Sequence, residues 1–168
     1  MSDPVALVMG GGAGTGRATA LAFSAAGAQV AVADINPVGA EQTVELIREQ
    51  GGDAMLLRCD MADGEAIKAA HQALMEHYGA LHWVSNNAAL AVPNKPITEL
   101  SDEEWDRCMN VTQKGVWRCM KQQLPLIQAS GGGAIVNIAS VSGLRGETFQ
   151  SAYSSAKGGV ITLSKAAA

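Results

Sequence analysis

The chain contains only two tyrosines, and one of them, Tyr153, lies four residues before Lys157 in the segment SAYSSAKGG. Side chains four residues apart on a helix lie on the same face, so both groups would point at the same place. A tyrosine acts as an acid or base near neutral pH only when nearby positive charge stabilises its phenolate. Lys157 supplies such a charge, and the pair therefore predicts proton exchange with a substrate oxygen.

Ser140 precedes Tyr153 by thirteen residues and ends the apolar run AIVNIAS. A nucleophilic serine needs a histidine base beside it. The three histidines, His71, His77 and His82, belong to a different part of the predicted fold, and no GxSxG surrounds the serine. We therefore interpret Ser140 as a hydrogen-bond donor and not as the nucleophile of a hydrolase.

A glycine-rich turn, GGGAGTGRATA, follows the first apolar run. Its spacing is GxxxGxG, at Gly10, Gly14 and Gly16, and the usual GxGxxG fingerprint is absent. A tight turn of this kind between a strand and a helix brings backbone N–H groups and a helix N-terminus close to a pyrophosphate. Taken alone, the cluster also fits an ordinary glycine-rich turn.

Asp34 lies 20 residues beyond Gly14, at the end of the second apolar run. An acidic residue in this place can accept hydrogen bonds from the adenosine ribose of a dinucleotide. It repels a 2′-phosphate, and the residues that follow Asp34 or precede Gly14 provide no cation to bind one. The sequence therefore favours NAD over NADP, and the alternative role of Asp34 is to cap the next helix.

Short apolar runs alternate with amphipathic stretches along the whole chain. The predicted strands are 5–9, 29–34, 54–59, 82–86 and 134–139. The predicted helices are 15–27, 37–50, 64–78, 102–129 and a last one from residue 151 onward. Continuously apolar strands indicate a sheet buried on both faces, and the alternation with helices predicts a parallel, doubly wound α/β sheet with right-handed crossovers.

The carboxyl ends of parallel strands meet at one edge, where open α/β sheets bind their ligands. Asp60, Asn86 and Ser140 are predicted to reach this edge, although turn chemistry alone also explains Asp60 and Asn86. Asp63 and Ser101 are predicted N-caps of the third and fourth helices. The apolar stripe of the fourth helix is interpreted as core packing.

Composition excludes several classes of partner. The net charge is −4 and the pI is about 5.3, with no dense Lys/Arg run, which argues against nucleic acid and acidic membranes. No apolar run is long enough to span a bilayer. Cys59, Cys108 and Cys119 form no CxxC pair and have no histidine at ligand spacing, so no metal site is predicted. These features predict a cytoplasmic protein whose cysteines lie in the core.

The motifs, in this order, resemble the short-chain dehydrogenase/reductase family, in its subgroup with TGxxxGxG, NNAG, a strand-end serine and YxxxK. The resemblance extends over the whole chain. It implies a Rossmann-type fold and an NAD-dependent oxidoreductase that interconverts a secondary alcohol and a ketone by hydride transfer. It also implies a homodimer or homotetramer, with Trp105 or Trp117 available for the interface.

The resemblance assigns a role to each matching residue. The implied cofactor-binding residues are Gly10, Gly14, Thr15, Gly16, Asp34, Asp60, Met61, Asn87, Tyr153 and Lys157. The implied catalytic residues are Asn110, Ser140, Tyr153 and Lys157. In this set Asn110, from the segment MNVTQKG, completes a proton-relay water site. Asn86, Asn87 and Ala88 match the structural NNA motif.

Two departures from the family pattern concern loops: Met9 replaces a threonine before the glycine turn, and Ala89 replaces the glycine of NNAG. We expect altered loop packing without loss of binding. Family members continue with two further strands and a lid helix over the substrate. The resemblance thus predicts that residues 1–168 form a single dinucleotide-binding domain truncated before its last two strands and lacking the lid, with the fifth strand or its neighbour exposed as a sheet edge.

Two other functions stay open at the level of sequence. A dinucleotide-binding fragment without turnover would have the same glycine turn and the same Asp34. A methyltransferase-like protein would use the turn and the acid for adenosylmethionine, but it would leave Tyr153 and Lys157 without a role. Neither the substrate nor the physiological direction follows from these residues.

Overall fold

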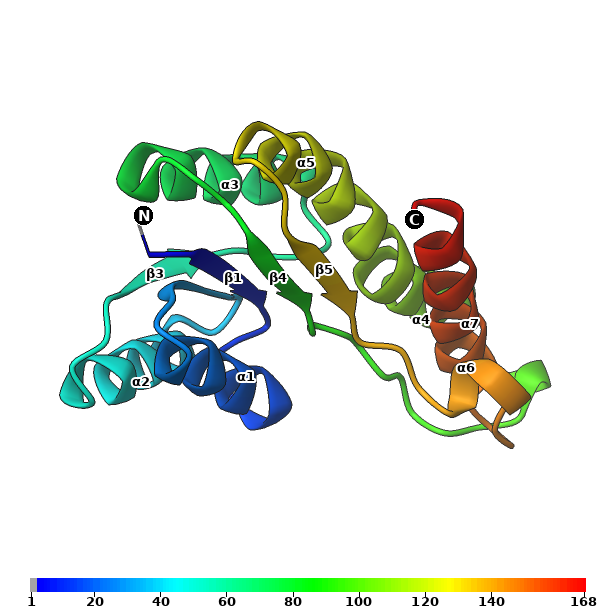
Figure 1. The fold of residues 1–168 in the computed structure, drawn as a ribbon. Helices are drawn as coiled ribbons and strands as arrows, with labels where there is room; N and C mark the ends of the chain where they lie inside the picture. The colour runs from blue at the N-terminus through cyan, green and yellow to red at the C-terminus, as the bar shows by residue number, and fades with distance from the viewer. Residues whose placement is uncertain (1–2) are drawn as a thin grey trace.

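The computed structural model describes residues 3–168, which form a five-stranded parallel sheet with the strand order β3-β2-β1-β4-β5. The strands are β1 (Val5–Met9), β2 (Gln29–Asp34), β3 (Ala54–Arg58), β4 (Trp83–Asn86) and β5 (Ala134–Asn137). The chain runs outward from β1 to β3 and then returns to the other side of β1 (Figure 1). The strand order therefore reverses between β1 and β4, which is where doubly wound sheets bind ligands.

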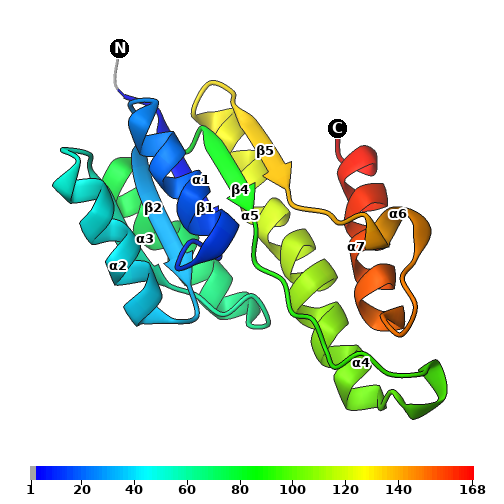
Figure 2. The same cartoon turned by 90° about the horizontal axis from the view of Figure 1, so that it is seen from below.

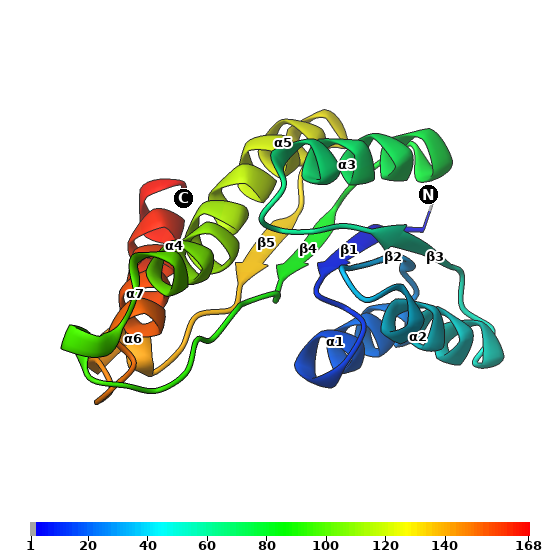
Figure 3. The same cartoon turned by 180° about the vertical axis from the view of Figure 1, so that it is seen from behind.

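Helices cover both faces of the sheet, as the sequence predicts. One face carries α1 (Gly14–Ala25) and α2 (Pro37–Glu49), and the other carries α3 (Gly64–Tyr78) and α5 (Gly115–Ala129) (Figure 3). All five residues of β1 are buried, because this central strand has a helical layer on each side. The doubly wound Rossmann-type prediction is confirmed.

A third group of elements lies beyond β5 (Figure 2). It comprises the short 3-10 helix η1 (Ile97–Glu99), α4 (Asp102–Met109), the π-helical segment η2 (Asn110–Lys114), α6 (Ser142–Arg145) and α7 (Ser151–Ala166). Helix α7 packs against α4, η2 and α6 and has few contacts with the sheet itself. The helix that carries Tyr153 and Lys157 is therefore positioned mainly by other helices.

The predicted helix 102–129 is confirmed as helical throughout, but its residues 110–114 form the π-helical segment η2 between α4 and α5. The N–H of Gly115 donates to the carbonyl of Asn110, which is the i→i+5 pattern of a π-turn. Within η2, the hydroxyl of Thr112 bonds both the N–H and the carbonyl of Leu90, at 3.0 and 3.2 Å. These contacts with a distant loop stabilise the turn, and spacing along the chain does not reveal them.

The two predicted N-caps are confirmed. The Asp63 carboxylate accepts from the N–H of Glu65 at 2.8 Å at the start of α3. Ser101 forms a capping box at the start of α4, in which its hydroxyl accepts from the Glu104 N–H and the Glu104 carboxylate accepts from the Ser101 N–H. These caps fix where two of the helices next to the ligand edge begin.

Strand β5 forms one edge of the described sheet, as expected. Val136 on this strand is 54% exposed, and Ala134 is exposed as well.

Cys59, Cys108 and Cys119 are all buried free thiols. Among residues 3–168 no helix is long and apolar enough to cross a bilayer, and no cluster of three or more His, Cys, Asp or Glu side chains is arranged to bind a metal ion.

His71 of α3 makes stability depend on pH. Its Nδ1 bonds the carbonyl of Ile67 at 2.7 Å, but its Nε2 is buried without a partner. Burial lowers the pKa of His71 below its usual 6.5, and the bond to Ile67 opposes this only in part. Below pH 6.5 the His71 side chain gains a proton in the unfolded chain before it does so in the folded chain. The contribution of neutral His71 to the free energy of unfolding is therefore fully present above that pH and is lost as the pH falls.

We therefore expect His71→Leu to reduce the loss of melting temperature between pH 7 and about 5.5. Thermal unfolding followed by circular dichroism at several pH values measures this slope. His77→Gln is the matched control, because His77 is exposed on the same helix and should leave the slope as in the wild type. An unchanged slope in His71→Leu would show that other groups cause the acid sensitivity.

Candidate active site

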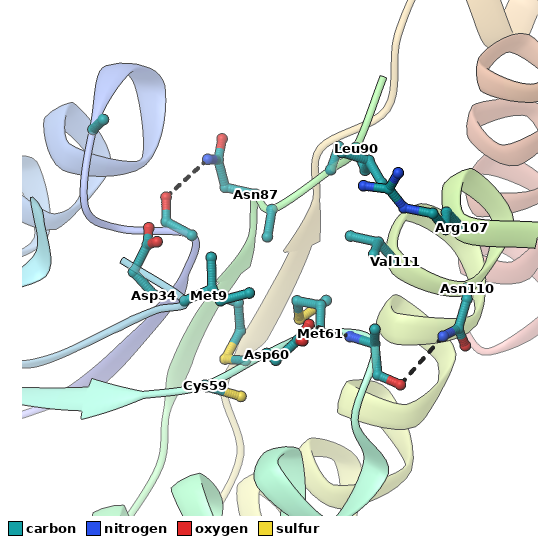
Figure 4. A pocket seen from close by; sticks show the side chains of 16 residues that line it. Met9, Asp34, Cys59, Asp60, Met61, Asn87, Leu90, Arg107, Asn110 and Val111 are labelled. Atoms are coloured by element: carbon teal, nitrogen blue, oxygen red, sulfur yellow. Dashed lines mark hydrogen bonds between the residues drawn. The ribbon is translucent and has the colours of Figure 1, made fainter. Parts of the chain in front are cut away.

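A pocket of about 550 Å³ lies at the carboxyl ends of β1 to β4, at the point where the strand order reverses. In Figure 4, Asp34 and Asn87 lie on one side, Asn110 and Arg107 on the other, and the residues after β3 between them. Its lining residues are Met9, Gly10, Ala13, Asp34, Ile35, Cys59, Asp60, Met61, Ala62, Asn87, Ala88, Ala89, Leu90, Arg107, Asn110 and Val111. Five of the predicted cofactor-binding residues, Gly10, Asp34, Asp60, Met61 and Asn87, are therefore in one cavity.

The glycine turn is packed too closely to carry side chains. A Cβ added to Gly16 would lie 1.9 Å from the carbonyl oxygen of Gly10. Gly10 itself has φ +80, and a Cβ there would lie 2.7 Å from the N of Ala88. The side chain of Asn87 donates to the Gly10 carbonyl at 3.1 Å and so joins the turn to the loop after β4 (Figure 4). Glycine at both positions lets the start of α1 reach the pocket edge.

Helix α1 begins without a side-chain cap. Its N-cap residue is Ala13, which offers no acceptor, and its first turn contains no acidic residue. In contrast, α2, α3 and α4 are capped by Asn36, Asp63 and Ser101. The backbone N–H groups of the first turn, including that of exposed Thr15, therefore lack a side-chain acceptor and can bind an anion.

Asp34 lines the pocket with its carboxylate already oriented. One oxygen accepts from the N–H of Gly12 at 2.8 Å and the other from the N–H of Asn36 at 2.9 Å. Asn36, and not Asp34, caps α2, because its side chain accepts from the N–H groups of Val38 and Gly39. The alternative role of Asp34 as a helix cap is therefore excluded.

The sequence neighbours of Asp34 provide no cation, but the fold brings Arg17 of α1 to the glycine turn, where it contacts Gly12. Its guanidinium donates to the carbonyls of Gly12 and Gly39, at 2.6 and 3.2 Å, and to the side chain of Gln42 at 3.0 Å. Its Nε donates to the Thr43 hydroxyl at 3.0 Å. Arg17 thus connects the glycine turn to α2, and protein acceptors already occupy its Nε and Nη2 donors.

The loop after β3 forms the middle of the pocket. The Asp60 carboxylate accepts from the N–H of Ala62 at 2.8 Å, so Asp60 stabilises the turn and lines the cavity at once. Met61 is buried, with its sulfur 3.4 Å from that of Cys119. Burial, with a smaller contribution from Asp60, raises the pKa of Cys59 to about 11, so this thiol is neutral and unreactive at physiological pH.

Tyr153 and Lys157 lie together on α7. The Lys157 ammonium is 5.8 Å from the centroid of the Tyr153 ring and donates to the carbonyl of Ile138, just beyond β5. Only 2% of Lys157 is exposed, and this burial lowers its pKa. The Ser140 hydroxyl accepts from the N–H of Ser142 at 3.1 Å, which orients the oxygen and leaves its proton free to donate. These three residues are not among those that line the pocket.

Asn110 begins the π-turn η2 and lines the pocket. Its side chain donates to the Ala62 carbonyl at 3.3 Å and accepts from Arg118 at 3.0 Å, while its own carbonyl accepts from Gly115. These bonds join η2 to the loop after β3 and to α5, and the relay role that the resemblance implies for Asn110 stays a prediction.

The structure also shows a residue that the sequence reasoning missed. Thr112 is fully buried in η2 and holds the backbone of Leu90, which lines the pocket. Cys108, one turn earlier, donates its thiol to the same Leu90 carbonyl and packs against Ala152 and Ala156 of α7. The sequence signal for this role was the position of Thr112 within a mostly apolar stripe. A hydroxyl that is buried in such a stripe needs a hydrogen-bond partner.

The histidines lie outside the predicted site. His82 Nδ1 accepts from the N–H of Val5 at 3.0 Å, which is at the amino end of the sheet, and His71 and His77 belong to α3. Ser140, in contrast, follows the carboxyl end of β5. The arrangement therefore provides no histidine base for a nucleophilic serine.

Comparison with known proteins identifies the family. The model of the short chain dehydrogenase family matches residues 4–168. A cyclohexanol dehydrogenase from Acinetobacter sp. (strain SE19) is 41% identical over 167 residues, which are 99% of this chain and 66% of that protein. A 2,5-dichloro-2,5-cyclohexadiene-1,4-diol dehydrogenase from Sphingobium indicum (strain B90A) is 39% identical, again over 66% of its length. This chain thus spans slightly less than two thirds of the length of these relatives.

Solved structures agree with this result. The crystal structure of a levodione reductase has a TM-score of 0.93 and 32% identity, over 97% of this chain and 64% of the other. That of an NAD⁺-bound xylitol dehydrogenase has a TM-score of 0.95 and 28% identity, over 98% of this chain and 64% of the other. With a family model that matches nearly the whole sequence, the chain belongs to the short-chain dehydrogenase family.

Proposed function

We propose that this chain is the dinucleotide-binding part of an NAD-dependent oxidoreductase that interconverts a secondary alcohol and a ketone. The observation that carries the proposal is the pocket at the strand reversal, which combines an uncapped helix N-terminus with an oriented Asp34 carboxylate. A pyrophosphate fits the uncapped N-terminus of α1, and ribose hydroxyls fit the Asp34 carboxylate. The family and the NAD⁺-bound neighbour support this choice of cofactor.

Each residue then has a specific task. The N–H groups from Gly14 to Gly16 would bind the pyrophosphate, Asp34 the adenosine ribose, and the loop at Asp60 and Met61 the adenine. When bound, NAD supplies the ring that accepts a hydride from the carbinol carbon.

Two residues act on the substrate oxygen, and a third, Lys157, acts through Tyr153. Tyr153 takes the hydroxyl proton as the alcohol is oxidised and returns it in the reverse reaction. Ser140 donates a hydrogen bond to the same oxygen. Lys157 keeps a positive charge beside the Tyr153 ring and would also hold the nicotinamide ribose.

We propose a cyclic secondary alcohol, such as cyclohexanol, as the substrate class. Three relatives, from Acinetobacter, Sphingobium and Sinomonas, are named as dehydrogenases of six-membered-ring alcohols. Three exposed apolar side chains, Val141, Leu144 and Phe149, lie in the segment between Ser140 and Tyr153. Phe149 has a left-handed backbone, φ 62, a strain that is more frequent in functional segments.

Assembly and location are proposed on narrower grounds. Trp105 is partly buried against the cluster of Cys108, Ala152 and Ala156, whereas Trp117 on α5 is 46% exposed with Lys121 above its ring. Trp117 is therefore the better candidate for a homodimer or homotetramer interface. The buried free thiols support a cytoplasmic location.

The preference for NAD should depend on Asp34. Asp34→Ser removes the charge that repels a 2′-phosphate and the acceptor for the ribose hydroxyls, so we expect NAD affinity to fall about tenfold and NADP affinity to rise. Calorimetric titration with both cofactors measures the change. The control is Asp53→Ser, which removes a carboxylate at the other end of the sheet and should leave both affinities unchanged. An unaltered NAD to NADP ratio in Asp34→Ser would contradict the assignment.

The proposed activity is tested by mixing the protein with NAD and cyclohexanol and following NADH absorbance, with calorimetry of NAD binding in parallel. Binding together with NADH formation supports the whole proposal. Binding without turnover for cyclohexanol and other cyclic alcohols would favour the alternative of a dinucleotide-binding protein without catalysis. Absence of binding by the folded chain would contradict the function of the pocket.

A further inference from the structure

Arg118 on α5 belongs to none of the motifs above, yet it contacts the loop that forms the middle of the pocket. We propose that Arg118 is a positioning residue that holds residues 60–62 in the shape needed by the adenine end of the cofactor. This inference rests on the proposed function, because it concerns the same pocket. The residue touches the pocket wall and not the cofactor.

The contacts of Arg118 form a closed triangle. Its Nη1 donates to the Ala62 carbonyl at 2.7 Å and to the Asn110 side-chain oxygen at 3.0 Å. The Asn110 side-chain nitrogen then donates to the same Ala62 carbonyl at 3.3 Å. Figure 4 shows the Asn110 bond to this carbonyl at the edge of the cavity. Three elements, the loop after β3, η2 and α5, are thereby joined at one oxygen.

This oxygen is the point at which the backbone of the loop is hydrogen-bonded to other elements. Within the described structure, the backbone of Asp60, Met61 and Ala62 makes its hydrogen bonds to other elements at the Ala62 carbonyl; its other bonds stay within residues 60–63. The loop also presses against α5, since a Cβ on Gly115 would lie 2.7 Å from the Met61 carbonyl. Gly115 permits the close approach, and Arg118, one turn later on α5, fixes it.

Loss of the guanidinium should therefore loosen the loop without moving the reaction centre. A ligand that binds a mobile loop must order it, and this cost lowers affinity. Tyr153 and Lys157 belong to α7, which Arg118 does not contact through any hydrogen bond in residues 3–168. We expect the dissociation constant for NAD and its KM to rise about tenfold in Arg118→Met, with a much smaller change in kcat.

A matched control separates positioning from general stability. Arg48 donates to the Ala54 carbonyl at 2.8 Å, at the first residue of β3, whereas Arg118 acts just after the strand ends. Arg48→Met thus removes the same kind of bond at the opposite end of the same strand. It should lower the melting temperature but leave NAD and AMP affinity unchanged.

The experiment is calorimetry of NAD, AMP and nicotinamide mononucleotide with wild type, Arg118→Met, Arg118→Lys and Arg48→Met, with melting temperatures and steady-state kinetics. We expect Arg118→Met to weaken NAD and AMP equally and to leave the mononucleotide unaffected, and Arg118→Lys to restore part of the affinity. Unchanged AMP affinity in Arg118→Met, or an equal loss in Arg48→Met, would overturn the inference. A wild-type protein that binds neither NAD nor AMP would instead overturn the proposed function, and the inference with it.

Asn110 provides a second, independent check. If Asn110 helps to hold the Ala62 carbonyl, Asn110→Ala should have the same effect as Arg118→Met and raise the KM for NAD. A loss confined to kcat would mark the relay role implied by sequence and would contradict its place beside Arg118.

Discussion

Replacing Tyr153 by phenylalanine is expected to lower kcat about a thousandfold and to leave the affinity for NAD within about twofold. The substitution removes only the hydroxyl that would exchange a proton with the substrate oxygen. The ring stays in place, packed next to the cluster of Cys108, Ala152 and Ala156. Lys157 keeps its bond to the Ile138 carbonyl, so the surrounding structure does not depend on the lost group.

The second tyrosine of the chain provides the control. Tyr78 ends α3, and its hydroxyl lies 3.5 Å from an Asp53 oxygen at the amino end of the sheet. Tyr78→Phe removes the same atom far from the proposed centre and should leave kcat unchanged. Stopped-flow measurement of NADH formation reports turnover, and calorimetry reports NAD binding, so the two effects are measured separately. A Tyr153→Phe variant that keeps wild-type kcat would exclude Tyr153 as the acid and base, and one that loses NAD binding would indicate a structural role.

The second large effect concerns the glycine turn. A methyl group at Gly16 would lie 1.9 Å from the Gly10 carbonyl and 2.8 Å from the Asn87 side-chain nitrogen. The clash is with backbone, so the turn and the start of α1 must separate. We expect Gly16→Ala to weaken NAD binding at least about a hundredfold, because the N–H groups of the first turn would no longer face the pyrophosphate.

Ala18→Val is the control for this substitution, because it enlarges an exposed side chain on the same helix. Circular dichroism shows whether each variant is folded before calorimetry is performed. If Gly16→Ala does not fold, Gly12→Ala is the milder variant, since its methyl group would lie 2.8 Å from the Asp34 carboxylate and displace that side chain. Retention of wild-type NAD affinity by folded Gly16→Ala would contradict the proposed pyrophosphate site.

The sequence determined the elements that depend on local pattern. Continuous apolar runs located all five strands to within two residues at each end, because strands buried on both faces need no polar alternation. The glycine spacing and Asp34 located the proposed cofactor end, since close backbone approach requires specific residues at fixed places. The four-residue spacing brought Tyr153 and Lys157 to one face, because helix geometry alone fixes that relation.

Only the tertiary structure decided how distant segments meet. The π-turn at Asn110 is bonded to Leu90 through Thr112, and the Asn110 side chain bonds the Ala62 carbonyl, both partners being far away in sequence. The helical position of Arg17 brought a cation to a loop whose sequence neighbours contain none. Arg118 gives no signal in the sequence, because its acceptor at Ala62 becomes a neighbour only when α5 packs against the loop after β3. Hydrogen bonds between side chains and remote carbonyls depend on the path of the folded chain, and local pattern contains no record of that path.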